Sequence, residues 1–143
     1  MSRIALAKAN KIISAAFARA KEQGFNPLSV AVLDAGGHLI AFQRQDGSSM
    51  LRFEIATGKA YGALALGVGS RTINKMAIDR PHFIAGLAGV SGDKIVPVPG
   101  GVLVRAKNGE IVGAVGVTGD TSDNDEDAAV TGIEAANFVA DAG

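Results

Sequence analysis

The segment LSVAVLDAGGHLIAFQ, residues 28–43, decides the fold because it has the pattern of a complete β-hairpin. Residues 28–33 are rich in β-branched and small apolar side chains, which favours a strand. Residues 34–37, Asp-Ala-Gly-Gly, are typical of a tight turn, since glycine readily adopts the positive φ that hairpin turns need. Residues 38–43 return as the second strand, so the chain is predicted to contain an antiparallel sheet.

A second hairpin is predicted in the C-terminal third of the chain. Residues 102–106 and 111–117 have the pattern of strands, and Asn108-Gly109 between them is a strong hairpin-turn signal. The two glycines inside the later strand indicate a bulge, or a close approach by another backbone or a ligand. The run 95–99 is expected to be extended because its two prolines disfavour a helix.

Helices are predicted around and between the two hairpins. Apolar residues recur at three- and four-residue spacing over residues 3–23, and Gly24 ends this helix. A second helix runs to Leu66, with Ser48 or Ser49 as its expected N-cap. The remaining helices are predicted over Ser70–Ile78, Pro81–Leu87 and Ser122 to about Ala140.

This order of elements predicts one α+β domain, residues 1–143, with helices packed on an antiparallel sheet. Hydrophobic residues make up 48% of the chain and charged residues 20%, which excludes intrinsic disorder. The absence of cysteine excludes a thiolate nucleophile and any cysteine-ligated metal. The two histidines are too far apart in sequence to form a helical metal pair, so no metal site is predicted.

The composition argues against two classes of partner, nucleic acids and membranes. Lys plus Arg equals Asp plus Glu at 14 each, and the chain has six Phe, one Tyr and no Trp. A neutral chain with few aromatics is not typical of a nucleic-acid binder, and its low net charge favours association instead. No apolar run approaches ~20 residues, so no membrane partner is expected. The N-terminus lacks the apolar core of a signal peptide, so we expect a cytoplasmic protein.

Three places in the sequence concentrate unusual chemistry. The first is residues 34–47, where Asp34 ends one strand and Asp46 follows the next, although both acids can simply order turns. Lys59 is a single cation in a helix stripe of small residues, where it either extends to water or acts as a desolvated base or electrophile. The pairs Gly100-Gly101 and Thr118-Gly119 allow backbone amides to approach a ligand carboxylate or phosphate, although turn geometry alone also explains them.

The start of the last helix carries more acids than a helix cap needs. Ser122 and Asp125 have the spacing of a capping box. We expect the surplus acid Glu126 to face a cation, either in the first helix of a neighbouring subunit or as a bound metal, with plain solvation as the remaining alternative. Residues 1–21 carry five basic residues and no acid, which makes the subunit contact the favoured interpretation.

Several of these motifs together resemble the haem-degrading domain family, which includes GlcG-like and HbpS-like proteins and the C-terminal domain of PduO. The resemblance extends in order from about residue 3 to residue 140, and no single motif in it is specific. The matching motifs are residues 27–39, Arg44-Gln45-Asp46-Gly47, Lys59-Ala60, Pro99-Gly100-Gly101-Val102, residues 112–119 and Asn124-Asp125-Glu126.

The resemblance implies a profilin-like or PAS-like sandwich around a five-stranded antiparallel sheet flanked by helices. It also implies a homo-oligomer, either a dimer or a dimer-based octamer. Several members of the family bind haem, and some degrade it or sense redox stress. The leading hypothesis is therefore a small haem-binding protein.

In that hypothesis Arg44 and Lys59 pair with the haem propionates, and His38 or His82 ligates the iron. Gly100, Gly101, Thr118 and Gly119 are also expected to contact the cofactor. An alternative is an enzyme acting on a small oxygenated carboxylate or carbonyl metabolite, with Lys59, Asp125 and Glu126 as catalytic residues. A third hypothesis is a non-catalytic oligomeric accessory protein of a catabolic operon.

Overall fold

The computed structural model describes residues 3–143, and the first two residues of the predicted domain lie outside this part. The described chain forms five helices and five strands. The helices are α1 (Leu6–Gln23), α2 (Arg52–Leu66), α3 (Ser70–Asp79), α4 (Pro81–Val90) and α5 (Ser122–Ala135). The strands are β1 (Ser29–Asp34), β2 (Leu39–Arg44), β3 (Gly101–Arg105), β4 (Ile111–Thr118) and β5 (Val139–Asp141).

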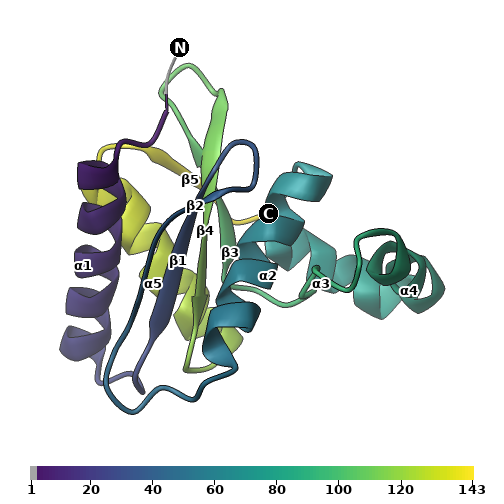
Figure 1. Cartoon of the computed structure of the whole chain (residues 1–143), viewed down its shortest axis with the longest axis horizontal. Coiled ribbons are helices and arrows are strands. Elements are labelled where there is room, and N and C mark those ends of the chain that lie inside the picture. Colours follow the sequence, from purple (N-terminus) through teal and green to yellow (C-terminus); the bar gives the residue numbers. More distant parts are fainter. Residues whose placement is uncertain (1–2) are drawn as a thin grey trace.

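The five strands form one antiparallel sheet in the order β2-β1-β4-β3-β5. Both predicted hairpins are confirmed, because β1 pairs with β2 and β3 pairs with β4. Helices α1 and α5 lie side by side on one face of the sheet, and α2 covers the other face (Figure 1). The structure therefore confirms the expected α+β fold with a five-stranded antiparallel sheet flanked by helices.

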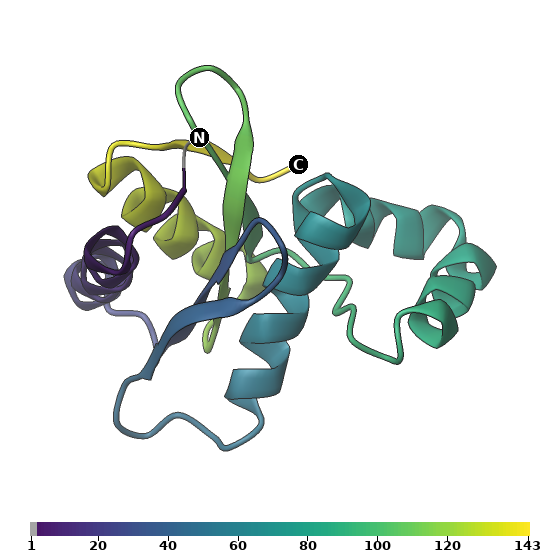
Figure 2. The ribbon, with the colours of Figure 1, turned by 45° about the horizontal axis from the view of Figure 1, so that its top comes forward.

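Two helices leave this layered body. α3 and α4 follow α2 and extend away from the sheet, so that α4 forms the far end of the molecule in both views (Figure 2). Residues 91–100 then return to the sheet without forming a helix or strand. We call α3 and α4 together the arm. Within residues 3–143, no helix combines the length and the apolar character that a membrane crossing requires.

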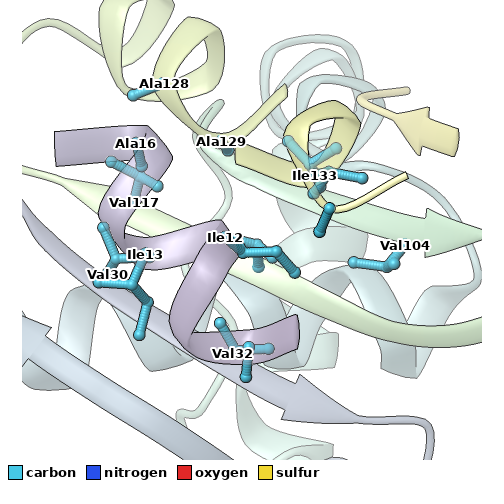
Figure 3. Close-up of a cluster of buried hydrophobic side chains, with 14 of the residues drawn as sticks. Ile12, Ile13, Ala16, Val30, Val32, Val104, Val117, Ala128, Ala129 and Ile133 are labelled. Carbon is cyan, nitrogen blue, oxygen red and sulfur yellow. The ribbon is translucent and has the colours of Figure 1, made fainter. Parts of the chain in front are cut away.

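The main core lies between the sheet and the layer formed by α1 and α5. Branched side chains from α1, β1 and α5 meet there, and alanines on the two helices allow them to pack closely (Figure 3). Full burial of each large side chain contributes about 1.5–3 kcal/mol to folding. The members drawn with labels are Ile12, Ile13, Ala16, Val30, Val32, Val104, Val117, Ala128, Ala129 and Ile133.

On the opposite face, α2 approaches the sheet closely through small residues. A side chain at Gly116 of β4 would collide with the carbonyl oxygen of Ala56, so only glycine fits there. Leu33, Ala60 and Leu103 fill the rest of this thinner layer. Gly116 is one of the two glycines for which the sequence predicts a bulge or a close approach. It allows the backbone of α2 to pack closely against β4.

The end of the last helix differs from the prediction. α5 ends at Ala135, so the expected helix to about Ala140 is wrong. Asn137 adopts a φ of 67°, a left-handed conformation that ends the helix. β5 then pairs with the edge of β3, where strand hydrogen bonds replace helical ones. A three-residue strand carries too little alternation to be recognised from sequence.

Both predicted side-chain caps are also wrong. The N-cap of α5 is Thr121, whose hydroxyl accepts a hydrogen bond from the Asn124 backbone N–H at 3.2 Å. Ser122 is therefore inside the helix and forms no capping box. α2 starts at Arg52 without a side-chain cap, so neither Ser48 nor Ser49 has that role.

Candidate functional site

Lys59 and Asp125 form a buried ion pair where β4 ends. Each side chain is 2% exposed, and Lys59 Nζ lies 3.0 Å from Asp125 Oδ2. The same ammonium group donates to the Val117 carbonyl oxygen at 3.0 Å. The other carboxylate oxygen of Asp125 accepts from the Asp120 backbone N–H at 2.9 Å. Of the two alternatives for Lys59, the structure excludes extension to water, and the pair brings together two of the three expected catalytic residues.

Burial determines the protonation chemistry of this pair. Desolvation lowers the pKa of the Lys59 ammonium, and the facing carboxylate of Asp125 opposes that effect. Desolvation likewise raises the pKa of Asp125, opposed by the charge of Lys59 and by the hydrogen bond from Asp120. Removing either partner would leave an isolated charge in the interior, so the two residues stabilise the fold as a unit.

The expected binding glycines surround this ion pair, but the chain itself fills the space beside them. A Cβ at Gly100 would meet Val117 O at 2.6 Å and Lys59 Nζ at 2.9 Å. A Cβ at Gly101 would collide with the Lys59 carbonyl, and one at Gly119 would collide with the Pro27 carbonyl. The space beside each of these glycines is thus occupied by neighbouring atoms of the chain. This favours the alternative in which the glycines serve the geometry of the chain and do not contact a ligand.

Thr118 belongs to the same cluster, and its side chain also forms a contact within the chain. Its side chain is buried, and its hydroxyl accepts a hydrogen bond from Arg52 Nη1 at 2.8 Å. The Gly101 backbone N–H donates to Ser70 Oγ at 2.7 Å. None of the five surface hollows described for residues 3–143 is lined by Lys59, Thr118 or Asp125.

Glu126 has a cation partner within its own chain. Arg71 Nε of α3 lies 2.9 Å from Glu126 Oε1, and Arg71 Nη2 lies 2.5 Å from Asp123 Oδ1. These two acids hold the Arg71 pKa above its ordinary value. Helix α1 does face the acidic start of α5, but in the same copy and through Asp127, which Arg19 contacts at 2.8 Å. The expected subunit contact of Glu126 is therefore corrected to an intrachain ion pair.

The other expected haem contacts lie at three separate places. His38 is exposed at the β1–β2 turn, where its Nδ1 lies 3.2 Å from Asp34 Oδ1. His82 is exposed on α4, at the far end of the arm. Arg44 is exposed beside a polar hollow of about 590 Å³, whose wall also contains Lys21 and Asp46. Within one copy, neither histidine lies near Lys59 or Arg44 in a common site.

A different hollow, which the sequence analysis missed, has the wall of a binding site for an apolar molecule. It encloses about 460 Å³ between the outer face of α2 and the returning segment after α4. We call it the α2 hollow. Its wall consists of Leu51, Phe53, Glu54, Ile55, Thr57, Gly58, Tyr61, Asp93, Lys94 and Val96.

Small residues of α2 hold the returning segment in place. A Cβ at Gly58 would meet Val96 Cγ2 at 2.5 Å, and one at Gly62 would meet Ile95 Cγ2 at 3.0 Å. The Val96 backbone N–H donates to the Gly58 carbonyl at 3.3 Å. The small-residue stripe that flanks Lys59 in the sequence therefore positions one wall of the α2 hollow.

Aromatic and polar groups complete this wall. Phe53 packs edge-to-face against Phe42 of β2, with ring centroids 4.9 Å apart. The Lys94 ammonium lies 5.4 Å from the Tyr61 ring centroid. Thr57 Oγ1 is buried and has no hydrogen-bond partner among residues 3–143. Phe53, Thr57 and Tyr61 recur at intervals of four, a helical pattern that was the available sequence signal.

The arrangement supports ligand binding more readily than metal binding. Within residues 3–143, no three His, Asp or Glu side chains are grouped in a way that could hold a metal ion. The α2 hollow instead offers an apolar surface with a lysine at its edge, which is typical of small-molecule sites.

Comparison with known proteins gives consistent matches over nearly the whole chain. Residues 4–134 match the family described as HbpS-like haem-degrading proteins. An uncharacterised 15.0 kDa protein from the dhaT–dhaS intergenic region of Citrobacter freundii is 34% identical over 131 residues, covering 92% of this chain and 90% of that protein.

Two solved structures share the fold. The PduOC complex with haem superposes with a TM-score of 0.85 at 25% identity, covering 96% of this chain and 97% of that one. The ORFY protein of Klebsiella pneumoniae also gives a TM-score of 0.85, at 27% identity, with 96% and 93% coverage.

Proposed function

The chain belongs to the HbpS-like family of haem-degrading proteins, and from that premise we propose that it binds haem in the α2 hollow. The observation that carries the proposal is the composition of the wall: Leu51, Phe53, Ile55, Tyr61 and Val96 present apolar and aromatic surface to an open space. A solved relative in complex with haem has the same fold, which supports the cofactor assignment.

The residues of the α2 hollow fit the chemistry of haem. Its apolar side chains remove the macrocycle from water, and Lys94 supplies a cation for a propionate. Tyr61 is a type of side chain that ligates haem iron. Bound haem would supply redox chemistry at its iron, while the protein orients it and limits its contact with water.

The α2 hollow is a better candidate than the hollow beside Arg44. The latter is larger, and each wall carries three charged residues, but beside Arg44 only Ala20, Phe25 and Pro27 give apolar surface. A macrocycle there would meet fewer apolar side chains than in the α2 hollow. Lys94 therefore replaces Arg44 and Lys59 as the proposed propionate partner.

The alternative enzyme hypothesis has one observation in its favour, the ion pair of Lys59 and Asp125 with its opposing pKa shifts. Its third residue, Glu126, is engaged with Arg71. Both hydrogen-bonding groups of the buried pair are occupied by the chain, and no described hollow reaches them. These contacts support a structural role for Lys59 and Asp125.

Haem titration followed at the Soret band tests the proposal. We expect Lys94→Glu to weaken binding at least about fivefold, because an acid at the edge of the hollow repels the propionates. Tyr61→Ala should weaken it further by removing part of the aromatic wall. Arg44→Glu is the matched control, since it makes the same charge reversal at the other hollow, and it should leave the affinity unchanged.

A Soret band that keeps the position and intensity of free haem throughout the wild-type titration would refute haem binding. Loss of affinity in Arg44→Glu with full affinity in Lys94→Glu would move the site to the other hollow. Haem degradation would appear in the same experiment as a time-dependent loss of the Soret band in the presence of ascorbate and oxygen.

A further inference from the structure

Tyr61 lies between two hollows that follow one face of α2. It lines the α2 hollow, of about 460 Å³, and also a second hollow of about 180 Å³ beside the β1–β2 turn. We call the second one the turn hollow. A flat ligand that extends along α2 from one hollow to the other therefore passes the side chain of Tyr61. The wall of the turn hollow consists of Ala35, Gly36, Gly37, Tyr61, Leu64 and Ala65.

Two segments from different parts of the chain hold the Tyr61 ring. The Lys94 ammonium in the returning segment lies 5.4 Å from the ring centroid. At the β1–β2 turn, a Cβ on Gly37 would lie 3.9 Å from Tyr61 Cδ2, so the backbone of the turn also packs near the ring. Gly37 has a φ of 83°, which favours glycine at this place. These contacts position Tyr61 while its side chain stays half-buried.

The wall of the α2 hollow offers few other ligands for iron. Besides Tyr61, the charged residues Glu54, Asp93 and Lys94 carry donor atoms, and all three are exposed. A lysine ammonium has no free lone pair. An exposed carboxylate must give up its hydration water to enter an apolar site, which is costly. Tyr61 is therefore the side chain of this wall that is best suited to ligate iron.

We propose that Tyr61 is the axial ligand of haem iron in the α2 hollow, through its phenolate oxygen. The inference rests on the proposed function, because it takes haem as the ligand of this hollow. A tyrosine phenolate is one of the known axial ligands of haem. When ferric haem binds, the bond between Tyr61 Oη and iron forms and the phenol proton leaves to water. His38 and His82, by contrast, line none of the five hollows described for residues 3–143.

A phenolate ligand makes the site selective for ferric iron. The ligand is an anion, and the wall of the α2 hollow adds the two acids Glu54 and Asp93 against the single cation Lys94. A one-electron reductant such as dithionite adds a further negative charge to these surroundings, which is unfavourable. The iron then gains one electron, its bond to Tyr61 Oη breaks, and the phenolate takes up a proton from water. We therefore expect ferric haem to bind more tightly than ferrous haem.

Resonance Raman spectra of the haem-loaded protein test the ligand. The chain contains one tyrosine, so tyrosine ring modes that are enhanced together with an iron–oxygen stretch can come only from Tyr61. We expect both signals in the wild type. Tyr61→Phe keeps the aromatic ring and should still bind haem, but both signals should be lost and the Soret maximum should shift.

Two further variants make the comparison specific. Thr57→Val is the matched control, because it removes a hydroxyl from the same wall, and an aliphatic alcohol loses its proton far less readily than a phenol. It should keep the wild-type signals. Tyr61→His supplies a nitrogen ligand at the same place, so it should bind haem even if Tyr61→Phe does not, with the spectrum of histidine-ligated iron.

Titrations with and without dithionite measure the selectivity for ferric haem. Reduction should weaken binding by the wild type at least about fivefold, and by Tyr61→Phe less. A haem-loaded wild type without tyrosine signals, or Tyr61→Phe spectra equal to those of the wild type, would overturn the inference and leave haem binding intact. A wild type that leaves the spectrum of free haem unchanged would instead overturn the proposed function, and this inference with it.

Discussion

Lys59 and Asp125 join two helices that lie on opposite faces of the sheet, through side chains that meet 3.0 Å apart at the end of β4. α2 and α5 have the whole sheet between them, and this contact ties the two outer layers together. Because both side chains are 2% exposed, neither charge can be compensated by water if its partner is removed.

Lys59→Met should therefore lower the free energy of unfolding by about 3–5 kcal/mol, because Asp125 is left as an uncompensated buried group. The double variant Lys59→Met/Asp125→Leu should recover much of this loss, since it removes both charges. Urea denaturation of the two single variants and the double variant measures the coupling. Additive losses would show that the pair does not act as a unit.

Asp120, just before the N-cap of α5, makes stability sensitive to acid. The Asp120 carboxylate accepts hydrogen bonds from Asn26 N at 2.8 Å, Thr121 N at 2.9 Å and Asn124 Nδ2 at 2.7 Å. The bond from Asn26 and then that from Asn124 hold the pKa of Asp120 below its ordinary value of 3.8. The contribution of Asp120 is therefore present above pH 3.8 and is lost as the pH falls through the lower pKa of the folded state.

Asp120→Asn should lower the free energy of unfolding by about 1–2 kcal/mol at pH 7. The difference from wild type should shrink below pH 3.8, where the native carboxyl also loses its charge. Urea midpoints at several pH values measure this, with Asp46→Asn in the exposed loop as the control. A difference that stays constant down to pH 2 would contradict the assigned role.

Glu126→Lys should reduce stability without changing the assembly. It reverses the acid that faces Arg71 at 2.9 Å within one copy, so about 1 kcal/mol of stability should be lost. The mass measured by light scattering should stay at the wild-type value. Glu134→Lys, an exposed acid on the last turn of α5, is the control for a charge reversal. A lower mass with unchanged stability would restore the subunit contact that the sequence favoured.

The sequence predicted the sheet well because the two hairpins carry local signals. Alternating strand residues, Asp-Ala-Gly-Gly and Asn-Gly identify β1 to β4, whereas β5 is three residues long and forms through a contact with β3. Lys59 stood out by its small neighbours, but its partner Asp125 is 66 positions away, and no spacing rule connects them. The haem family was identified from several motifs in order.

The candidate site was predicted less well, because it is made of segments that meet only in the fold. Residues 51–61 and 93–96 form the α2 hollow after α2 receives the returning segment at Gly58. The glycines at positions 100, 101 and 119 had two interpretations in the sequence, and only the packing around them shows which atoms occupy the space.

Variants of the two histidines test the iron ligand expected from the sequence. If His82 is the iron ligand that the sequence suggests, His82→Ala should shift the Soret maximum or weaken haem binding. His38→Ala should do neither, since His38 contacts Asp34 at the opposite hairpin turn. Absorption spectra of the two haem-loaded variants give the comparison. Equal spectra for wild type and His82→Ala would exclude the histidine from the site.

The position of iron in crystals of the haem-loaded protein tests the central claim most directly. An anomalous difference map at the iron edge should show one peak per chain beside Phe53 and Tyr61, between α2 and the segment around Lys94. A peak beside Arg44, or crystals grown with haem that contain no ordered iron, would contradict the assignment of the α2 hollow as the haem site.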